Sequence, residues 1–184
     1  IGLDADSPEV VKLMDVFAQL HIDHEMNAST NTMKGTHAAG NDNPWRPVAN
    51  ATATLAGTRH GGANVDVLDN LKRIAILEPE EITAEGQTLA RIQAMDPAKV
   101  EARFKALDTN GLSKEAVEAR IEAYMEVFDR DKKAGLKPMI PGVGHAVYKN
   151  TDPRATVLKE QYNNVAAVNE ASGTLASLAT ALQD

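Results

Sequence analysis

The chain has 184 residues, of which 43% are hydrophobic and 24% charged, and it contains no cysteine. This composition is typical of a folded globular protein, and it excludes disulfides and zinc–thiolate sites. The 19 Lys and Arg residues against 26 Asp and Glu give a net charge of −7, which argues against nucleic acid and anionic membranes as partners.

No apolar run is long enough to span a bilayer, and no signal sequence opens at Ile1. We therefore expect a cytoplasmic protein without a membrane partner. Because the sequence begins with Ile1, we also expect the chain to be a fragment.

Apolar residues recur at helical spacing along almost the whole chain, while two-residue alternation is scarce and only 4% of residues are aromatic. The sequence therefore predicts an all-α protein. The first helix is predicted from Ser7, as its N-cap, to His21. The stretch 30–47 is rich in Asn, Thr, Gly and Pro and is predicted to be a long irregular segment. A helix of small residues is predicted over 48–56.

The later helices are predicted from their termini. Asn64 is predicted to cap the helix that follows the glycine-rich turn. Charged amphipathic helices are predicted over 78–133, the best specified of them capped by Ser113. One further helix is predicted after Asp152 and a short last one after Gly173.

Four of the five histidines lie in three short motifs. His21 and His24 lie in His-Ile-Asp-His-Glu-Met-Asn, His60 in Arg-His-Gly-Gly-Ala-Asn, and His145 in Pro-Gly-Val-Gly-His-Ala. Neighbouring glycines let backbone N–H groups approach a ligand, and imidazole can donate to an oxyanion or exchange a proton near neutral pH. Together with Lys149 and Arg154, these histidines predict a convergent site for carboxylates or phosphates.

A metal site is an alternative interpretation of the first motif. His21 and His24 are three residues apart and so share a helix face, with Glu25 beside them. Neither the His-Glu-x-x-His order nor its inverse is present, so we predict no metal ligation. A metal-dependent hydrolase that uses His21, His24 and Glu25 is kept as a third hypothesis.

The three motifs occur in the same order as in the bacterial-type citrate synthases, which they resemble. The stretches that carry the resemblance are 21–30, 60–64 and 141–155. The resemblance implies a multi-helical fold, with part of the large domain over 1–63 and a small helical domain over 64–184. On this interpretation the chain is a central segment of such an enzyme, truncated or diverged.

The resemblance also implies an activity. Citrate synthases are homodimeric acyltransferases of the tricarboxylic acid cycle, which condense acetyl-CoA with oxaloacetate to give citrate and CoA. The partners implied are therefore oxaloacetate, acetyl-CoA as co-substrate and a second copy of the chain, with no permanently bound cofactor.

Roles for individual residues follow from the same resemblance. His60 matches the residue that hydrogen-bonds the acetyl carbonyl oxygen as it becomes an enolate, and His145 matches the one that donates to the oxaloacetate carbonyl. His24 and Arg154 match residues that bind the oxaloacetate carboxylates, and Asn27 lies in the same binding element. The residues matched to coenzyme binding are Pro141, Gly142, Val143 and Gly144, in a loop that packs against adenine, and Lys149, near the phosphates.

The catalytic base of the family is the aspartate of Asn-Val-Asp-Phe-Tyr-Ser-Gly. The closest stretch here begins at Val168 and places Asn169 at the base position, and an amide cannot accept the methyl proton. This departure leaves open a second hypothesis, a non-catalytic citrate-synthase-like protein with a binding or structural role.

Overall fold

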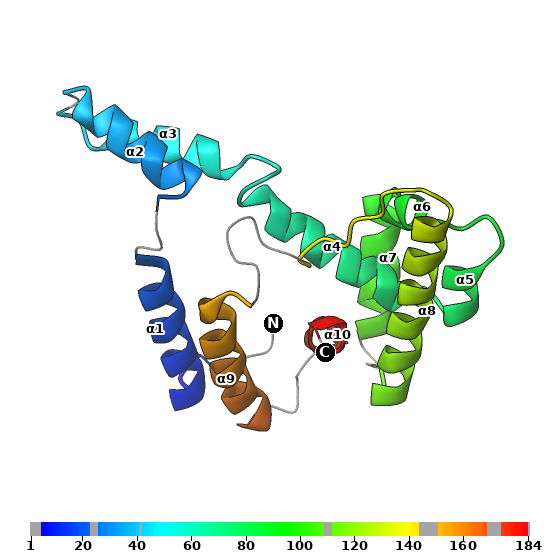
Figure 1. Cartoon of the computed structure of the whole chain (residues 1–184). Coiled ribbons are helices and arrows are strands. Elements are labelled where there is room, and N and C mark those ends of the chain that lie inside the picture. Colours follow the sequence, from blue (N-terminus) through cyan, green and yellow to red (C-terminus); the bar gives the residue numbers. More distant parts are fainter. Residues whose placement is uncertain are drawn as a thin grey trace. The chain divides into compact units, whose positions relative to one another are not determined.

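The computed structural model describes residues 5–22, 26–40, 42–108, 112–143, 151–168 and 174–183. Every regular element in these ranges is a helix, so the all-α prediction is confirmed. In chain order the helices are α1 (Pro8–Ile22), α2 (Ala28–Ala38), α3 (Trp45–Leu55), α4 (Gly62–Ile76), α5 (Pro79–Thr83), α6 (Leu89–Gln93), α7 (Pro97–Asp108), α8 (Lys114–Lys133), α9 (Pro153–Val168) and α10 (Thr174–Gln183) (Figure 1). Within this described part of the chain, no helix is long and apolar enough to cross a membrane.

Several helix termini lie where the sequence predicts them. The first helix begins at Pro8, directly after Ser7. The hydroxyl of Ser113 caps α8 by accepting a hydrogen bond of 3.2 Å from the backbone N–H of Ala116. The carboxylate of Asp152 accepts from a backbone N–H in the first turn of α9. These starts are predictable because capping is a local interaction.

The prediction of an irregular segment over 30–47 is wrong, since α2 and the start of α3 occupy most of this stretch. The polar side chains of this segment form hydrogen bonds within α2 and between α2 and α3. The hydroxyls of Thr32 and Thr36 donate to carbonyl oxygens four residues earlier, and Thr54 of α3 donates to Thr32 across 3.2 Å. Contacts between the two helices therefore override the low helix propensity of the segment.

Asn64 is not the cap of α4, because the helix already begins at Gly62. Backbone groups of the preceding turn take the place of a side-chain cap. The N–H groups of Gly62 and Ala63 donate to the carbonyl oxygens of Gly57 and His60. The first turn of α4 is thus continuous with the turns that follow α3.

The chain divides into two compact units. The described residues of the first unit lie within 1–64 and 144–171, and those of the second within 65–143 and 172–184. In the first unit, α1 packs against α9 and α2 against α3 (Figure 1). The assignment of 1–63 and 64–184 to a large and a small domain stays a prediction.

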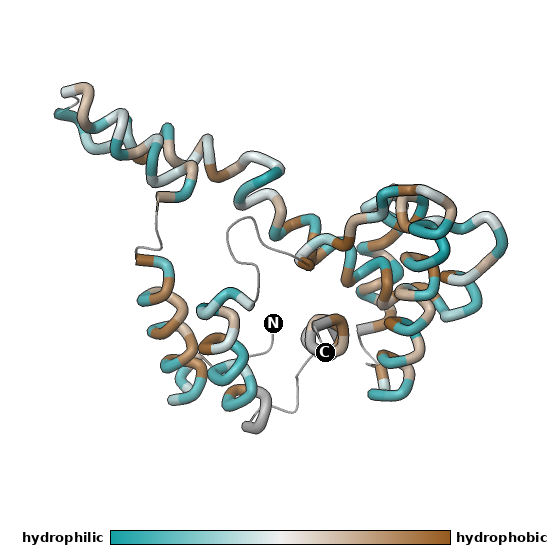
Figure 2. The backbone as a smooth tube through the Cα atoms, viewed as in Figure 1, coloured by the Kyte–Doolittle hydropathy of each residue, from teal (hydrophilic) through white to brown (hydrophobic). Residues whose placement is uncertain are grey.

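The second unit contains the main apolar core. Helices α5, α6 and α10 pack against α8, and Figure 2 shows hydrophobic residues recurring along these helices. The largest side chains that are fully buried in this core are Tyr124, Ile74, Ile82, Leu89, Ile92, Leu178 and Val127.

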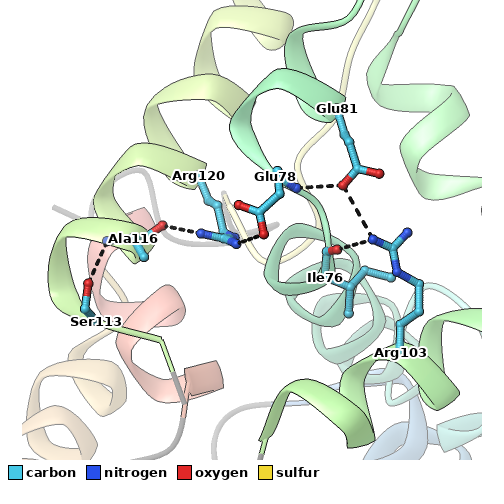
Figure 3. A network of polar contacts seen from close by, with 7 residues as sticks. All are labelled: Ile76, Glu78, Glu81, Arg103, Ser113, Ala116 and Arg120. Carbon is cyan, nitrogen blue, oxygen red and sulfur yellow. Dashed lines mark hydrogen bonds and ion pairs between the residues drawn. The ribbon is translucent and has the colours of Figure 1, made fainter. Parts of the chain in front are cut away.

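Arginines tie the helix ends of this unit together (Figure 3). Arg120 of α8 is buried and forms an ion pair of 2.6 Å with Glu78, the N-cap of α5. Arg103 of α7 donates to the carbonyl oxygen of Ile76, the last residue of α4, across 2.7 Å. The last carbonyls of a helix have no partner within it, so Arg103 satisfies one that would otherwise lack a donor.

A third arginine and a buried carboxylate hold the connection between α5 and α6. Arg130 of α8 donates to the backbone carbonyl oxygens of Thr83 and Gln87, across 3.1 and 2.6 Å. The neighbouring Asp131 is buried, and its Oδ2 accepts from the backbone N–H of Leu89 across 2.9 Å. One turn of α8 therefore fixes both ends of this connection.

Candidate functional site

His60 lies in the tight turn between α3 and α4 and is half-buried. Its Nε2 lies 2.9 Å from the hydroxyl oxygen of Ser29, in the first turn of α2. The turn depends on the glycine that follows, because a Cβ at Gly61 would lie 2.6 Å from the carbonyl oxygen of Leu55. The glycine therefore allows the close backbone approach that places His60 next to α2.

Asn27 holds the other side of Ser29. Its Oδ1 accepts hydrogen bonds of 2.8 Å from the backbone N–H of Thr30 and from the Ser29 hydroxyl. The Thr30 N–H can only donate, so it fixes the orientation of the Asn27 amide. The result is a continuous polar chain from Asn27 through Ser29 to His60.

The orientation of the Ser29 hydroxyl is coupled to which nitrogen of His60 carries the proton. A hydroxyl has a single hydrogen, so when Ser29 donates to Asn27 it accepts from His60 Nε2–H. When the hydroxyl rotates and donates to His60 Nε2, the proton of the neutral ring lies on Nδ1. The rotation of one hydroxyl thus decides whether Nδ1 is an acceptor or a donor.

Arg154 lies at the start of α9 with its guanidinium oriented by Asp152. The Nη2 of Arg154 donates to Asp152 Oδ2 across 2.7 Å, and its Nε lies 3.2 Å from Oδ1. The same Oδ1 accepts from the Arg154 backbone N–H. The carboxylate therefore fixes the guanidinium and caps the helix at once.

The segment 139–143 belongs to the second unit and is held at three places. The Met139 carbonyl oxygen accepts a hydrogen bond of 2.8 Å from Gln93 Nε2, and the Ile140 side chain lies in the core. Gly142 has φ +85°, and a Cβ there would lie 2.9 Å from Val67 Cγ2. The predicted coenzyme residues Pro141, Gly142 and Val143 therefore lie on an anchored turn.

The structure brings together two of the predicted site residues, Asn27 and His60. It does so through Ser29, which the sequence analysis missed although it lies two residues after Asn27. No spacing rule indicates a contact between residues 31 positions apart. Four predicted residues lie outside the described part of the chain, namely His24, Gly144, His145 and Lys149.

The hypothesis of a metal site rests on His21 and on two residues outside the described ranges, His24 and Glu25. The Nδ1 of His21 lies 2.7 Å from the Phe17 carbonyl oxygen, and the two rings lie 4.2 Å apart. In the described ranges, no three His, Asp or Glu residues are grouped to hold a metal ion. The metal-dependent hydrolase stays a hypothesis.

The fold and the site define an all-α protein with a polar site centred on a histidine. A family model described as "Citrate synthase, C-terminal domain" matches residues 2–184. The chain is 31% identical over 153 residues to "Citrate synthase" of Synechocystis sp., an alignment covering 83% of this chain and 27% of that protein. It is 30% identical over 179 residues to "Citrate synthase 1" of Mycobacterium tuberculosis, covering 96% and 31%. No solved structure matches the chain significantly.

The chain therefore belongs to the citrate synthase family, a family of acyltransferases. A third relative, "Citrate synthase" of Acidithiobacillus ferridurans, is 28% identical over 160 residues. The chain spans about three tenths of the length of the curated relatives it matches. The resemblance derived from the histidine motifs is thus confirmed.

Proposed function

We propose that the protein containing this chain condenses acetyl-CoA with oxaloacetate and releases citrate and CoA. The observation that carries the proposal is the contact of His60 Nε2 with the Ser29 hydroxyl, in a chain that belongs to the citrate synthase family. Because Asn169 cannot accept the methyl proton, the proposal places the base, a carboxylate, elsewhere in the full-length protein. As that carboxylate takes a proton from the acetyl methyl group, negative charge develops on the thioester oxygen. A fixed hydrogen-bond donor at that oxygen stabilises the enolate as it forms.

In this proposal His60 donates to the thioester oxygen from Nδ1, because Nε2 is engaged with Ser29. A neutral ring can donate from Nδ1 when the Ser29 hydroxyl donates to Nε2. The Oδ1 of Asn27 keeps its hydrogen bond from Thr30 in that state. The proposal therefore requires the Ser29 hydroxyl to turn from Asn27 Oδ1 to His60 Nε2, and any contact of Asn27 with substrate comes from its Nδ2 donors.

The remaining roles follow the family resemblance. His145 donates to the oxaloacetate carbonyl under attack, while His24 and Arg154 bind the two carboxylates. Arg154 suits this role because its guanidinium carries five N–H donors, so it can bind a substrate carboxylate while Nε and Nη2 stay on Asp152. The coenzyme lies against Pro141, Gly142, Val143 and Gly144, and Lys149 meets its phosphates. Acetyl-CoA is a co-substrate, and the proposal needs no permanently bound cofactor. A place in the tricarboxylic acid cycle and the cytoplasmic location stay predictions.

The proposal is tested by following thiol release from acetyl-CoA with the full-length protein. We expect CoA to appear only when oxaloacetate is present, because the enolate has no acceptor without it. Full-length protein that binds oxaloacetate in calorimetry but releases no thiol would instead support the non-catalytic hypothesis, which Asn169 at the position of the base favours. Protein that neither binds oxaloacetate nor releases thiol would contradict the proposed activity and the ligand-binding form of the non-catalytic hypothesis.

We further propose that the protein is a homodimer. Among the described residues of the first unit, few side chains are buried and several large apolar ones are exposed on α1, α2 and α3. The most exposed members of this set are Ile22, Trp45, Met14 and Val11. Exposed apolar side chains of this kind become buried when such helices form an interface, as the homodimer implied by the family resemblance would allow. Sedimentation equilibrium of the full-length protein should give twice the chain mass, and a monomer at micromolar concentration would contradict the proposal.

A further inference from the structure

A chain of side-chain hydrogen bonds in the second unit leads from the buried core to the segment 139–143. It begins at Asn70 of α4, whose Oδ1 accepts from the Tyr124 hydroxyl of α8 across 2.9 Å. The Tyr124 oxygen lies 3.5 Å from Nε2 of Gln93, at the end of α6. The same Nε2 donates to the Met139 carbonyl oxygen across 2.8 Å. Three helices thus contribute one residue each to hold one main-chain carbonyl.

The donors and acceptors fix the direction of every bond in this chain. Tyr124 has one hydroxyl hydrogen, and it donates that hydrogen to Asn70. The Tyr124 oxygen is then left to accept from Gln93, whose amide carries two hydrogens and can serve Tyr124 and Met139 together. The contact with Tyr124 in the core therefore orients the Gln93 amide toward the Met139 carbonyl oxygen.

The inner end of the chain is a polar pair in an apolar core. Tyr124 is 0% and Asn70 1% exposed, and Asn70 Nδ2 has no hydrogen-bond partner in the described structure. A buried amide with an unpaired donor costs free energy that an apolar pair of the same volume would not. Burial also raises the pKa of the Tyr124 phenol, so it stays a donor at physiological pH. We therefore infer that the Tyr124–Asn70 pair orients the Gln93 amide and does not add to the stability of the core.

The outer end of this hydrogen-bond chain is the segment 139–143, in which Ile140 alone is buried. The Met139 side chain is 79% exposed, and Val143 is exposed as well. The anchors are the Ile140 side chain in the core, the close approach of Gly142 to Val67, and the hydrogen bond from Gln93. Among these three, the bond from Gln93 is the one that fixes the carbonyl at the start of the turn.

We propose that Gln93, oriented by Tyr124 and Asn70, is a positioning residue that presets the turn 139–143 for coenzyme binding. The proposal rests on the proposed function, which assigns this turn to the coenzyme. A turn that is ordered before binding costs less conformational entropy when the ligand arrives. The Met139 carbonyl can turn to water when Gln93 is removed, because its surroundings are exposed. Loss of Gln93 should therefore weaken coenzyme binding without unfolding the unit.

The test compares Gln93→Ala and Gln93→Glu with wild type in the full-length protein. Glutamate keeps the size of the side chain but has no N–H donor for the Met139 carbonyl. We expect the KM for acetyl-CoA to rise about fivefold in both variants, the size of one hydrogen bond. The KM for oxaloacetate, kcat and the melting temperature should stay near wild type. An unchanged KM for acetyl-CoA in both variants would overturn the proposal.

Gln87→Ala is the matched control, since Gln87 lies in the same unit and its backbone carbonyl alone makes the contact with Arg130. We expect this variant to keep the wild-type KM for acetyl-CoA. A rise equal to that of Gln93→Ala would overturn the assignment to Gln93.

Hydrogen exchange separates failure of this proposal from failure of the proposed function, because it needs no activity. The Val143 N–H is bonded to the Ile140 carbonyl oxygen across 3.1 Å, so its exchange rate reports the order of the turn. We expect faster exchange at Val143 in Gln93→Ala than in wild type. Unchanged exchange would overturn the positioning role, even if the enzyme is active. Thiol release absent in wild type would overturn the proposed function and with it the role in coenzyme binding, whatever the exchange rates.

Discussion

Alanine in place of His60 is expected to lower kcat for oxaloacetate-dependent release of CoA by about 10²–10³-fold. This is the loss typical of removing one donor from a developing oxyanion. The half-buried ring contacts Ser29 and lies outside the main apolar core, so its removal should change the melting temperature little. The measurement is thiol release at saturating oxaloacetate and acetyl-CoA, with full-length wild type and variant compared at equal concentration.

His37→Ala is the matched control, because His37 is an exposed histidine of α2 outside the proposed site. It should leave kcat near wild type, whereas His145→Ala should cause a loss of the same order as His60→Ala. Ser29→Ala should cause a smaller loss, about tenfold, since it removes the partner that selects the tautomer but leaves the ring. Wild-type kcat in His60→Ala would contradict the proposed role.

Ile74→Ala is expected to destabilise the second unit by about 2–5 kcal/mol. Ile74 is 0% exposed and lies on α4 against the core that includes Tyr124. Truncation removes buried methylene and methyl groups and leaves a cavity that rigid neighbouring helices cannot fully close. Urea unfolding followed by circular dichroism measures the loss. The only tryptophan of the sequence, Trp45, lies in the first unit, so its fluorescence is not a suitable probe for this unit.

Leu68→Ala supplies the comparison for this experiment, since Leu68 lies on the same helix but is 42% exposed. Its truncation removes less buried area, and we expect a loss below about 1 kcal/mol. Equal losses for the two variants would mean that α4 does not bury the face that includes Ile74.

The helix starts and the all-α class could be predicted because they depend on residues close together in the sequence. Ser113 caps α8 within three residues, and Asp152 does the same for α9 within two. The helix α2 could not be predicted in this way. Its threonines have low helix propensity, and the contact of Thr32 with Thr54 lies 22 positions away in the sequence. Non-local contacts of this kind are invisible to local propensity.

The same limit applies to the candidate site. The glycine-bordered motif predicts that His60 has a special role, and the resemblance adds Asn27. The link between them is Ser29. Within the second unit, the link between the core and the segment 139–143 is Gln93, 46 positions away from Met139. Both links depend on how helices pack, so sequence spacing alone indicates neither.

The hydrogen bonds from Arg130 to the connection between α5 and α6 do not depend on the side chains of that connection. Arg130 binds the main-chain carbonyls of Thr83 and Gln87, and every amino acid offers such a carbonyl. Substitution of the Thr83 or Gln87 side chain therefore keeps the contact, whereas substitution of Arg130 removes it. Gly86 is an exception within the connection, because its φ of +73° disfavours other residues. The connection is thus held by two neighbouring residues of α8, Arg130 and Asp131, that lie more than 40 positions away from their partners in it.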